Sequence, residues 1–381
     1  MTRLSPAILF TVAVLFLAPF SGYSQRGKTQ KDSLNGDGPY ILYTASGVRM
    51  ISVDQEGDIS DNITPALPEG YTFTVKDHRG KLPFEVTLRP IQREPWHYPP
   101  KSPKTFVMSD PHGRLDCVVS LLQGNGVIGE DLKWSYGDGH LVVIGDIFDR
   151  GEDVTQIFWL FYELQREAPL SDGKVTMLLG NHEPMEFAGD MRYAKTKYTA
   201  LANALSVEYR NLWNKDSELG RWIGSWNTVA LIGDNIYVHG GLGKDFYDWN
   251  LPIEEVYRQM SRAIYLKSAE RKALSDTLEF LYGSFGPIWY RGLVQKDSKR
   301  RPIAADSLQM ILSRYGASHI IVGHTIFKDI STFYGGIVID VNVDNRVNMR
   351  KRRGRALLIE NGEYWVVGDK GKKRRLSQPL P

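Results

Sequence analysis

The chain has 381 residues, of which 42% are hydrophobic and 24% charged, with 36 Gly and 19 Pro. This composition is typical of a globular protein and excludes a disordered, collagen-like or coiled-coil chain. The length predicts two domains, or one large domain with an appendage. The one cysteine, Cys117, excludes an intramolecular disulfide framework and a cysteine-based zinc site. Apolar residues recur around Cys117 at helical spacing, which predicts that it is buried.

The charge is distributed unevenly along the chain. The net charge is +3, but residues 350–381 contain ten Lys or Arg against three acids. A basic tail on a slightly acidic body could contact nucleic acid or lipid headgroups. The sequence contains no signature of a nucleic-acid-binding fold, so we expect a solvated terminus and no nucleic-acid partner.

The N-terminal 25 residues have the features of a signal peptide. A basic residue precedes an apolar stretch from Ala7 to Phe20, and small polar residues follow it. This stretch is too short to span the ~30 Å of a bilayer core comfortably, whereas it suits a signal-peptide core. Gly22 and Ser24 provide small residues before a cleavage site after Ser24 or Gln25. The sequence therefore predicts an exported protein, periplasmic or secreted, without a stable membrane span after cleavage. An uncleaved membrane anchor is the alternative.

Changes in composition divide the rest of the chain into segments. Polar, Gly-rich residues are typical of a linker, and short β-prone runs separated by Gly, Pro and Asp are typical of a small antiparallel module. The predicted segments are a linker over 26–39, a small β-rich module over 40–100, a main domain over 104–345 with helical insertions at about 186–225 and 251–281, and a β-hairpin with the basic tail over 346–381.

Strands alternate with helices in the main domain. Apolar runs at 105–108, 141–144 and 175–179 each stop at a polar turn that contains glycine. Helical patterns follow the first two runs, at 114–123 and 152–167. This alternation predicts an α/β fold, in which ligands bind beyond the carboxyl ends of the strands.

Five short motifs end predicted strands, and each offers a metal ligand. Any one of them is weak evidence, because a lone His at a strand end is usually a surface or core residue. Together they hold four of the eight His of the chain, which indicates one shared site. The motifs are Ser109-Asp110-Pro111-His112-Gly113, Gly145-Asp146-Ile147-Phe148-Asp149-Arg150-Gly151, Gly180-Asn181-His182-Glu183, Val238-His239-Gly240-Gly241 and Val322-Gly323-His324-Thr325.

These residue types suit the hydrolysis of a phosphate ester. The reaction needs a strong nucleophile at neutral pH and cations beside a highly charged phosphoryl group. Two metal ions ~3.5–4 Å apart meet both needs, because water between them loses a proton readily. A carboxylate can contact both ions, and His nitrogens with an amide oxygen suit Mn, Fe or Zn better than Mg or Ca.

In this order and at these spacings, the five motifs resemble the calcineurin-like metallophosphoesterase superfamily. Asp149-Arg150-Gly151 and Glu183 make the chain similar to the phosphoprotein phosphatase (PPP) family, and the stretches GNHEPMEFAGDMRYA and GPIWYRGL resemble its bacterial-type branch, the Shewanella-like phosphatases. The resemblance covers about 104–345. It implies a β-sheet sandwich flanked by helices, with the small N-terminal β module outside it.

The resemblance also implies a role for individual residues. Two divalent ions, with Mn favoured and Fe or Zn as alternatives, would be the cofactors. A hydroxide that bridges them would attack the phosphorus directly. The implied metal ligands are Asp110 and His112 for the first ion, Asp146 as the bridge, and Asn181, His239 and His324 for the second. The implied catalytic residues are His182 as general acid, Asp149 as its orienting partner, and Arg150 and Arg291 as a phosphate clamp.

Some residues depart from the family pattern. Ser109 stands where the family usually has Gly, and Pro111 follows Asp110, so we expect a changed loop conformation with metal binding retained. Asp190 and Arg192 match the bacterial-type branch, but we favour the interpretation that they form a structural ion pair. The remaining histidines, at positions 78, 97, 140 and 319, match no motif and are expected to be structural or exposed.

The sequence thus predicts a phosphomonoesterase of the protein Ser/Thr (or Tyr) phosphatase type, with a phosphorylated protein or a small phosphomonoester as substrate. A hydrolase of dinucleoside polyphosphates or other small molecules is the alternative. Such relatives usually replace the Asp before Arg-Gly and carry Asp after Asn-His, so Asp149 and Glu183 argue against it. An inactive binding protein on the same scaffold is disfavoured because every expected ligand is present. The sequence does not predict an oligomeric state.

Overall fold

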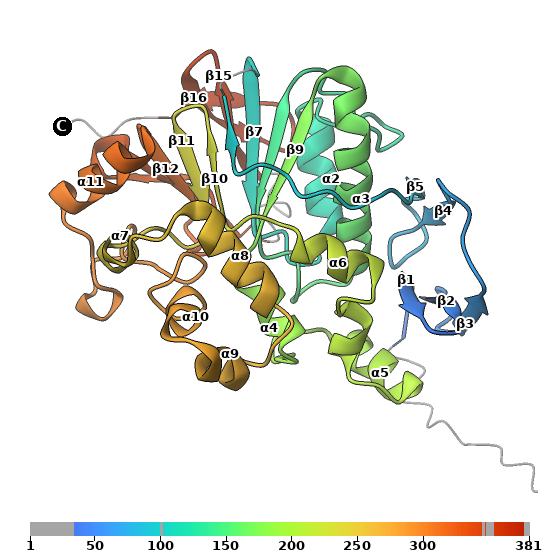
Figure 1. Ribbon diagram of the computed structural model, residues 1–381. Coiled ribbons are helices and arrows are strands. Elements are labelled where there is room, and N and C mark those ends of the chain that lie inside the picture. The colour runs from blue at the N-terminus through green and yellow to red at the C-terminus, as the bar shows by residue number, and fades with distance from the viewer. Residues whose placement is uncertain (1–33, 100–101, 345–346, 348–353, 377–381) are drawn as a thin grey trace, which may run out of the picture.

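Two six-stranded sheets form the centre of the computed structural model, which describes residues 34–99, 102–344, 347 and 354–376 (Figure 1). The first sheet has the order β17 (Lys373–Arg375), β16 (Glu363–Gly368), β15 (Arg355–Glu360), β7 (Lys104–Ser109), β8 (His140–Ile144) and β9 (Lys174–Leu178). The second has the order β13 (Ser331–Phe333), β14 (Val338–Asp340), β12 (His319–Val322), β11 (Asn235–Val238), β10 (Val229–Ile232) and β6 (His97–Tyr98). The predicted signal peptide, 1–25, lies outside the described residues.

The two sheets pack face to face as a sandwich. Alternate residues of a strand point to opposite faces, so Val107 of β7 faces the second sheet while Phe106 and Met108 belong to the core under the helices. The layer between the sheets is apolar and buried; it includes Val142, Ile144, Leu178, Ala230, Tyr237, Ile321, Ile339 and Leu357. Strands buried on both faces explain why β7, β8 and β9 are continuous apolar runs in the sequence.

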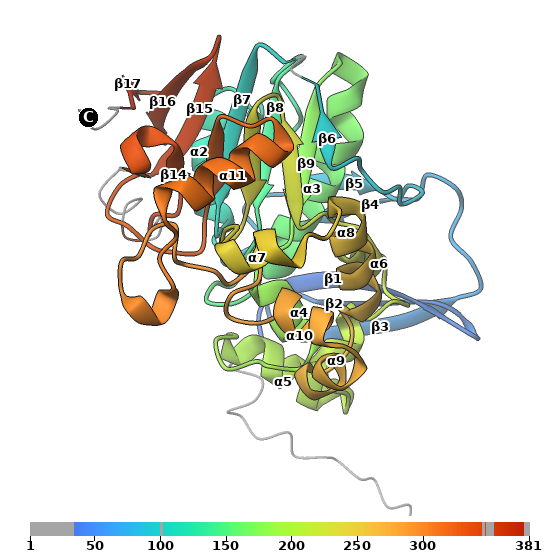
Figure 2. The same cartoon turned by 60° about the vertical axis from the view of Figure 1, so that its left-hand side comes forward.

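Helices cover the outer faces of the sandwich. Helices α2 (Leu115–Gly124) and α3 (Val154–Glu167) lie beside β7–β9, and α7 (Lys244–Trp249) and α11 (Ala305–Tyr315) lie on the side of the second sheet (Figures 1 and 2). This arrangement confirms the predicted α/β sandwich flanked by helices. Cys117 lies in α2 and is buried, as predicted.

The remaining helices gather at one end of the sandwich, below the sheets in Figure 1. They come from the two segments that were predicted as helical insertions and from the turn that precedes the first. They are α4 (His182–Phe187), α5 (Thr196–Leu205), α6 (Glu218–Gly224), α8 (Ile253–Ala263), α9 (Ser268–Leu274) and α10 (Asp276–Leu281). Short 3-10 turns lie at Ala168–Ser171, Tyr209–Trp213, Ser298–Arg300 and Tyr334–Gly336. Among the described helices, none combines the length and the hydropathy that crossing a membrane requires.

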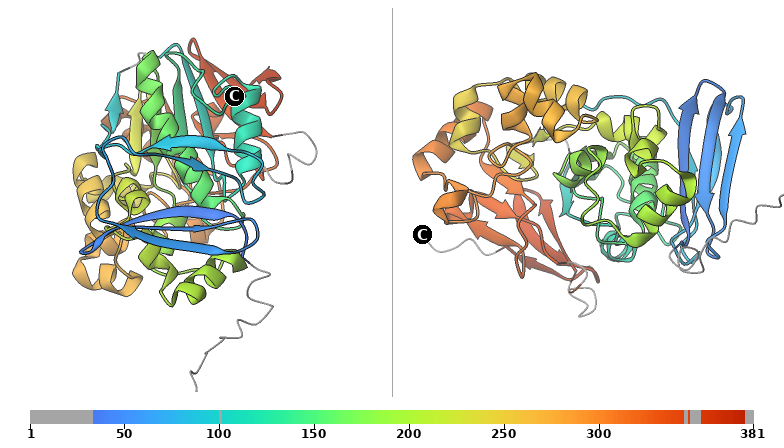
Figure 3. Two further views of the ribbon diagram at one scale, coloured as in Figure 1. Left: turned by 90° about the vertical axis from the view of Figure 1, so that its right-hand side faces the viewer. Right: turned by 90° about the horizontal axis from the view of Figure 1, so that it is seen from below.

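The N-terminal part forms two small antiparallel sheets (Figure 3). One contains β1 (Asp37–Thr44), β2 (Gly47–Val53) and β3 (Ile59–Thr64), and the other contains β4 (Thr72–Val75) and β5 (Phe84–Thr87). Strand β1 begins inside the predicted linker, because Asp37 already pairs with Val53. Strand β6, at the end of the range predicted for this module, pairs with β10 in the second sheet of the sandwich.

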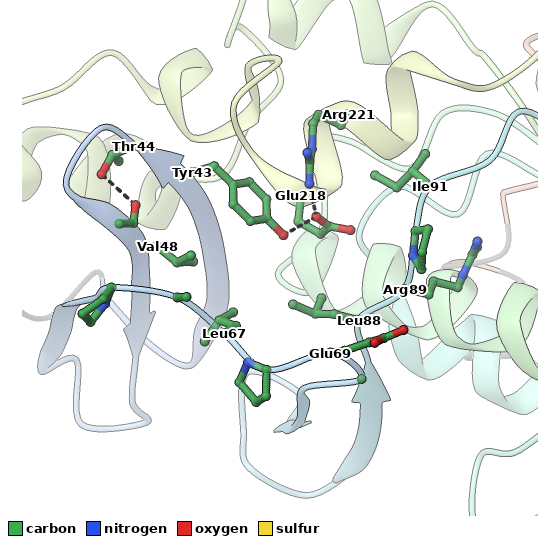
Figure 4. A pocket seen from close by; sticks show the side chains of 16 residues that line it. Tyr43, Thr44, Val48, Leu67, Glu69, Leu88, Arg89, Ile91, Glu218 and Arg221 are labelled. Atoms are coloured by element: carbon green, nitrogen blue, oxygen red, sulfur yellow. Dashed lines mark hydrogen bonds and ion pairs between the residues drawn. The ribbon is translucent and has the colours of Figure 1, made fainter.

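This β-rich part contacts the inserted helices through a polar network. The hydroxyl of Tyr43 donates to Glu218 of α6 at 2.7 Å, and the hydroxyl of Tyr162 in α3 donates to the same carboxylate at 2.8 Å. Arg221 donates to Glu218 as well. Beside this network lies a cavity of about 770 Å³ between the β-rich part and α6 (Figure 4). No residue of the five motifs lines it, so this cavity is separate from the predicted site.

The C-terminal hairpin completes the first sheet. Strand β15 pairs antiparallel with β7, and β16 returns along β15 through the predicted turn at Asn361 and Gly362, both of which have positive φ. Three basic residues of the tail form β17 and make ion pairs: Lys373 with Glu360 at 2.9 Å, Arg374 with Asp329 at 2.8 Å, and Arg375 with Glu363 at 2.8 Å. This part of the tail is therefore an ordered edge strand whose three side chains stay exposed to solvent.

Candidate metal centre and active site

All five motifs lie where strands end. Parallel pairing joins β7 to β8, β8 to β9, and β11 to β12, so the carboxyl ends of these strands meet at one edge of each sheet. The predicted site residues follow these strands: Asp110 and His112 after β7; Asp146, Asp149 and Arg150 after β8; Asn181 and His182 after β9; His239 after β11; and His324 after β12.

The turns that carry these residues hold an unusual backbone conformation. The φ angles are +49° at Asp110, +58° at Asp146, +75° at Asp149 and +65° at His324. A non-glycine residue in this region costs on the order of 1–3 kcal/mol and persists only where surrounding contacts fix it, typically at functional sites. Here hydrogen bonds between turns fix it; the amide of Asp110, for example, donates to Gly145 O at 3.2 Å.

Asp146 lies at the centre of the site and is buried. Its Oδ2 is 3.1 Å from His239 Nε2, 3.7 Å from His182 Nε2 and 3.9 Å from His112 Nε2. Its Oδ1 accepts from the backbone N–H of His182 at 2.9 Å. Two groups of potential ligands, whose atoms lie within 4.8 Å of one another, share this carboxylate: Asp146 with His112 and His182, and Asp146 with His239 and His324.

The histidine rings around Asp146 are oriented so that their Nε2 atoms can bind a metal ion. His112 Nδ1 lies 2.7 Å from Phe148 O and His239 Nδ1 lies 2.8 Å from Ile144 O, so in each ring a carbonyl holds Nδ1 and Nε2 is directed toward the other predicted ligands. The Nε2 atoms of His112 and His324 are buried without a hydrogen-bond partner. Burial lowers the pKa of His112 to about 3, although the charge of Asp146 opposes this, and burial also lowers the pKa of His324. The neutral, unpartnered imidazoles of His112 and His324 fit a metal site. His239 differs, because burial lowers its pKa but the charges of Asp146 and Asp110 outweigh burial and raise the pKa to about 9.

The other two predicted ligands complete the set. Asn181 Oδ1 is 3.1 Å from His239 Nε2. Asp110 Oδ2 is 3.9 Å from His112 Nε2 and accepts from Asn342 Nδ2 at 2.8 Å, which places Asp110 at the margin of the set. The structure therefore brings all six predicted ligands to one place, and the oxygen and nitrogen donors present fit two divalent cations.

Ser109, which stands where the family usually has Gly, is held by its neighbours in the structure. Its hydroxyl donates to Ile144 O at 3.1 Å and to the carboxylate of Asp110, so it helps to hold that side chain. It also lies against the turn after β12, where a Cβ on Gly323 would be 2.0 Å from Ser109 Oγ. The serine is accommodated because residue 323 is glycine, and Asp110 keeps its place.

Glu183 joins the turns that follow β8 and β9. Its buried carboxylate accepts from the backbone N–H groups of Gly180 at 2.8 Å, Ile147 at 2.9 Å and Asp146 at 3.1 Å. Gly180 is required at this junction, because a Cβ there would lie 2.2 Å from Asp146 Oδ1. Glu183, one of the residues that made the sequence similar to the phosphoprotein phosphatase family, thus holds the turn that carries the central carboxylate.

His182 differs from the other histidines of the site. Its Nδ1 forms a hydrogen bond with Asp149, and its ring lies 5.5 Å from that of Tyr193 between centroids. Burial lowers the pKa of His182, but the charges of Asp146 and Asp149 outweigh it, so the pKa is raised. A histidine that is held cationic is suited to donate a proton rather than to bind a metal.

The two predicted phosphate-binding arginines border the site. Arg150 is exposed and lines a cavity of about 120 Å³ together with Asp110, His112 and Asn342. In the part of the chain that the structure describes, Arg150 makes no ion pair with Asp149 or Asp153. Arg291 Nη1 donates to His324 O at 3.1 Å and Thr325 Oγ1 at 3.0 Å, which holds the half-buried guanidinium beside the ligand set.

A larger cleft opens beside the metal ligands, between α4, α9 and α10. It has a volume of about 500 Å³, and its lining includes Asn181, Tyr193, Arg271, Tyr282 and Trp289. At its rim Asp190 and Arg192 form a bidentate ion pair at 2.8 and 2.7 Å. This pair matches the structural interpretation from the sequence, although its position makes it part of the approach to the site.

Sequence analysis did not identify three residues near the site. Asn342 donates to Asp110, and Asp340 accepts from the backbone of Asn342 at 2.9 Å. In the sequence, Asp340 and Asn342 are the two polar residues of the otherwise apolar run IVIDVNV, and this pattern could have indicated that they lie at a site. Glu186, buried next to Asp149, is the third. The four histidines outside the motifs lie elsewhere; His140, for example, contacts Thr176 at 2.8 Å.

The comparison with known proteins agrees with this geometry. A sequence model of the calcineurin-like phosphoesterase family matches residues 103–327, more than half of the chain. The chain belongs to this family. Within it, the chain is similar to Shewanella-like protein phosphatase 2 of Arabidopsis thaliana, with 25% identity over 59% of this chain and 67% of the relative. An uncharacterized protein of Schizosaccharomyces pombe is 28% identical over 72% of this chain and 77% of its own length.

Among solved structures, the chain is similar to the cold-active protein-tyrosine phosphatase of a psychrophilic Shewanella. The two have a TM-score of 0.80 and 30% identity, and the match covers 90% of this chain and 99% of that one. The predicted resemblance is thus confirmed, and the chain is a metallophosphoesterase, a phosphatase of the Shewanella-like type. The catalytic and metal-binding roles of single residues stay predictions.

Proposed function

We propose that this phosphatase hydrolyses phosphomonoesters of proteins at a dinuclear metal centre and that it acts outside the cytoplasm. The observation that carries the proposal is the position of Asp146, whose Oδ2 lies 3.9 Å from Nε2 of His112, a predicted ligand of the first ion, and 3.1 Å from Nε2 of His239, a predicted ligand of the second. Two divalent cations that lie close together need a carboxylate that contacts both of them and offsets their positive charge. When bound, the two ions supply Lewis acidity and an activated water, and Mn suits the mixed nitrogen and oxygen donors.

In this proposal, some residues around the metal ligands bind the phosphate group and others protonate the leaving group. Arg150 and Arg291 bind phosphate oxygens, because a planar guanidinium matches them with two parallel hydrogen bonds. His182 donates a proton to the leaving oxygen, and Asp149 orients its ring through Nδ1. The low exposure of His182, 3%, keeps water from competing for that proton.

The cleft beside the site supports a protein substrate. It holds aromatic rings that a phosphotyrosine ring can contact, with Trp289 packed edge-on to His324 at 5.5 Å and Tyr193 near His182. The similar Shewanella enzyme is named a tyrosine phosphatase, so we include phosphotyrosine with phosphoserine and phosphothreonine. The dinucleoside polyphosphate alternative is disfavoured on the sequence alone, because such relatives usually lack the Asp at position 149 and the Glu at position 183.

A substrate panel tests the proposed function. The Mn-loaded protein is expected to release phosphate from phosphotyrosine, phosphoserine and phosphothreonine peptides at pH 7, and more slowly from diadenosine tetraphosphate. A preference for the dinucleotide would support the alternative. Binding of phosphopeptides without any phosphate release would instead indicate an inactive binding protein.

Arg150→Lys tests the phosphate clamp apart from the metals. Lysine keeps the charge but cannot form two parallel hydrogen bonds, so turnover and inhibition by inorganic phosphate should both weaken by about 10-fold, the equivalent of one bidentate contact of ~1.4 kcal/mol. The metal content should stay at two ions per chain. Arg258→Lys, at an exposed arginine of α8 that is paired with Glu255, is the matched control. An unchanged phosphate inhibition constant in Arg150→Lys would remove Arg150 from the clamp.

The proposed export rests on the apolar stretch from Ala7 to Phe20 and the small residues after it. N-terminal sequencing of the protein from its native host should find a mature chain that begins at Gln25 or Arg26. A chain that still begins near Met1 would contradict cleavage and favour a membrane anchor.

A further inference from the structure

Glu186 has a buried carboxyl group that plays no role in the proposed mechanism. It lies in α4, four residues after His182, so the two side chains are neighbours on one face of the helix. Its exposure is 1%, and the carboxylate of Asp149 next to it is equally buried. Glu186 therefore lies directly behind the pair formed by His182 and Asp149.

The two carboxyl groups cannot both be ionised in this arrangement. They lie within hydrogen-bond contact of each other, yet Glu186 Oε2 and Asp149 Oδ1 are buried without a conventional partner. Two buried carboxylates at this separation repel each other and have no hydrogen to share. One proton between them removes the repulsion and provides the missing hydrogen bond, so one of the two groups is a carboxylic acid.

The surroundings show which group holds the proton. Asp149 faces the imidazole of His182 and forms a hydrogen bond with its Nδ1. The charges of Asp149 and of the more distant Asp190 both disfavour a charge on Glu186, and the phenol of Tyr209 lies close enough to feel that charge. Burial raises the pKa of Glu186 well above its ordinary value, and the negative charge of Asp149 raises it further.

We propose that Glu186 is a protonated carboxylic acid that donates a hydrogen bond to Asp149 and thereby acts as a positioning residue for His182. The functional part of this inference rests on the proposed role of His182, whereas the protonation of Glu186 does not. The hydrogen bond fixes the Asp149 carboxylate in the plane that meets His182 Nδ1. It thus keeps His182 Nε2 directed toward the edge where Asp146 and the other ligands lie, 3.7 Å from Asp146 Oδ2.

Two substitutions separate the hydrogen bond from the volume of the side chain. In Glu186→Gln the amide N–H₂ can donate to Asp149 as the acid does. In Glu186→Leu a side chain of similar size has no donor. We expect Glu186→Leu to lower kcat about 10- to 100-fold on a phosphoserine peptide, the usual cost of losing an outer hydrogen-bond partner at a site, with KM little changed. Glu186→Gln should restore most of this loss.

A double-substitution cycle tests whether Glu186 acts through Asp149. In the Asp149→Asn background, Glu186→Leu should lower kcat no further, because the carboxylate that it positions is already absent. The loss should also be smaller on p-nitrophenyl phosphate, whose leaving group needs little protonation. Equal losses from Glu186→Leu in both backgrounds and on both substrates would show a merely structural role and overturn the positioning part of the inference.

Infrared spectroscopy tests the protonation without any activity. The difference spectrum between the unaltered protein and Glu186→Gln at pH 7 should contain the carbonyl band of a protonated carboxylic acid. Glu163→Gln is the matched control, since Glu163 is also buried but pairs with Arg166 at 2.5 Å, and this substitution should change only carboxylate bands. Carboxylate bands alone in the Glu186→Gln spectrum would overturn the inference. If the protein released no phosphate, the proposed function would fail while this result still stood.

Discussion

Asp146→Asn is expected to lower turnover to about a thousandth of the normal value or less, a loss of about 4 kcal/mol of transition-state stabilisation. The charge of Asp146 lies between the two groups of potential ligands, so its removal weakens the affinity for both cations at once. The fold should survive, because an amide oxygen can still accept the hydrogen bond from the backbone of His182. The test is to measure, on the same sample, the metal content by mass spectrometry and the rate on p-nitrophenyl phosphate.

A buried aspartate away from the site provides the control for this substitution. Asp77 is 1% exposed and accepts from the backbone N–H of Leu82 at 3.0 Å in the N-terminal part. Asp77→Asn should keep two bound ions and the normal rate, even if its stability falls. Two bound ions with a normal rate in Asp146→Asn would contradict the assignment of Asp146 as the shared ligand.

His182→Asn should lower kcat by roughly 10²–10⁴ on substrates with poor leaving groups, the usual contribution of a positioned general acid. A serine alkoxide must be protonated as it leaves, and Asn cannot supply the proton. With p-nitrophenyl phosphate the loss should be much smaller. Equal losses on both substrates would remove His182 from the role of general acid and leave a role in binding.

The pH dependence provides a second measurement on the same variant. Because the pKa of His182 is raised, its imidazole keeps its proton to a higher pH than a free histidine does. The rate on a phosphoserine peptide should therefore persist above pH 6.5 and fall as the pH rises through the raised pKa. His182→Asn should abolish this fall, because the group that loses its proton is gone.

Much of the fold was predictable because buried parallel strands leave a clear pattern. The strands β7, β8 and β9 are apolar runs buried on both faces, and each ends at a glycine-containing turn that carries a motif. The sequence could not show β3, whose residues ISDNIT are polar because the strand is mostly exposed. Strand β6 has two residues, too few for any periodicity, and only its pairing with β10 defines it.

The ligand set was also predictable, because each ligand lies within three residues after the end of a strand. The residues that hold the ligands were harder to find, since their contacts join distant parts of the chain. Asn342 reaches Asp110 across 232 positions of sequence, and no local pattern indicates that contact. Glu186 looked like an ordinary polar residue of a short helix, and only the packing of α4 shows that its carboxyl group is buried beside Asp149.

The central claim is that this chain holds two divalent cations around one shared carboxylate and needs them for hydrolysis. The most direct test removes all metal with a chelator, reloads the protein with Mn in steps, and measures bound ions and phosphate release at each step. The account predicts no activity without metal, and a rate that saturates at two ions per chain. Full activity of the metal-free protein, or saturation at a single ion, would contradict it.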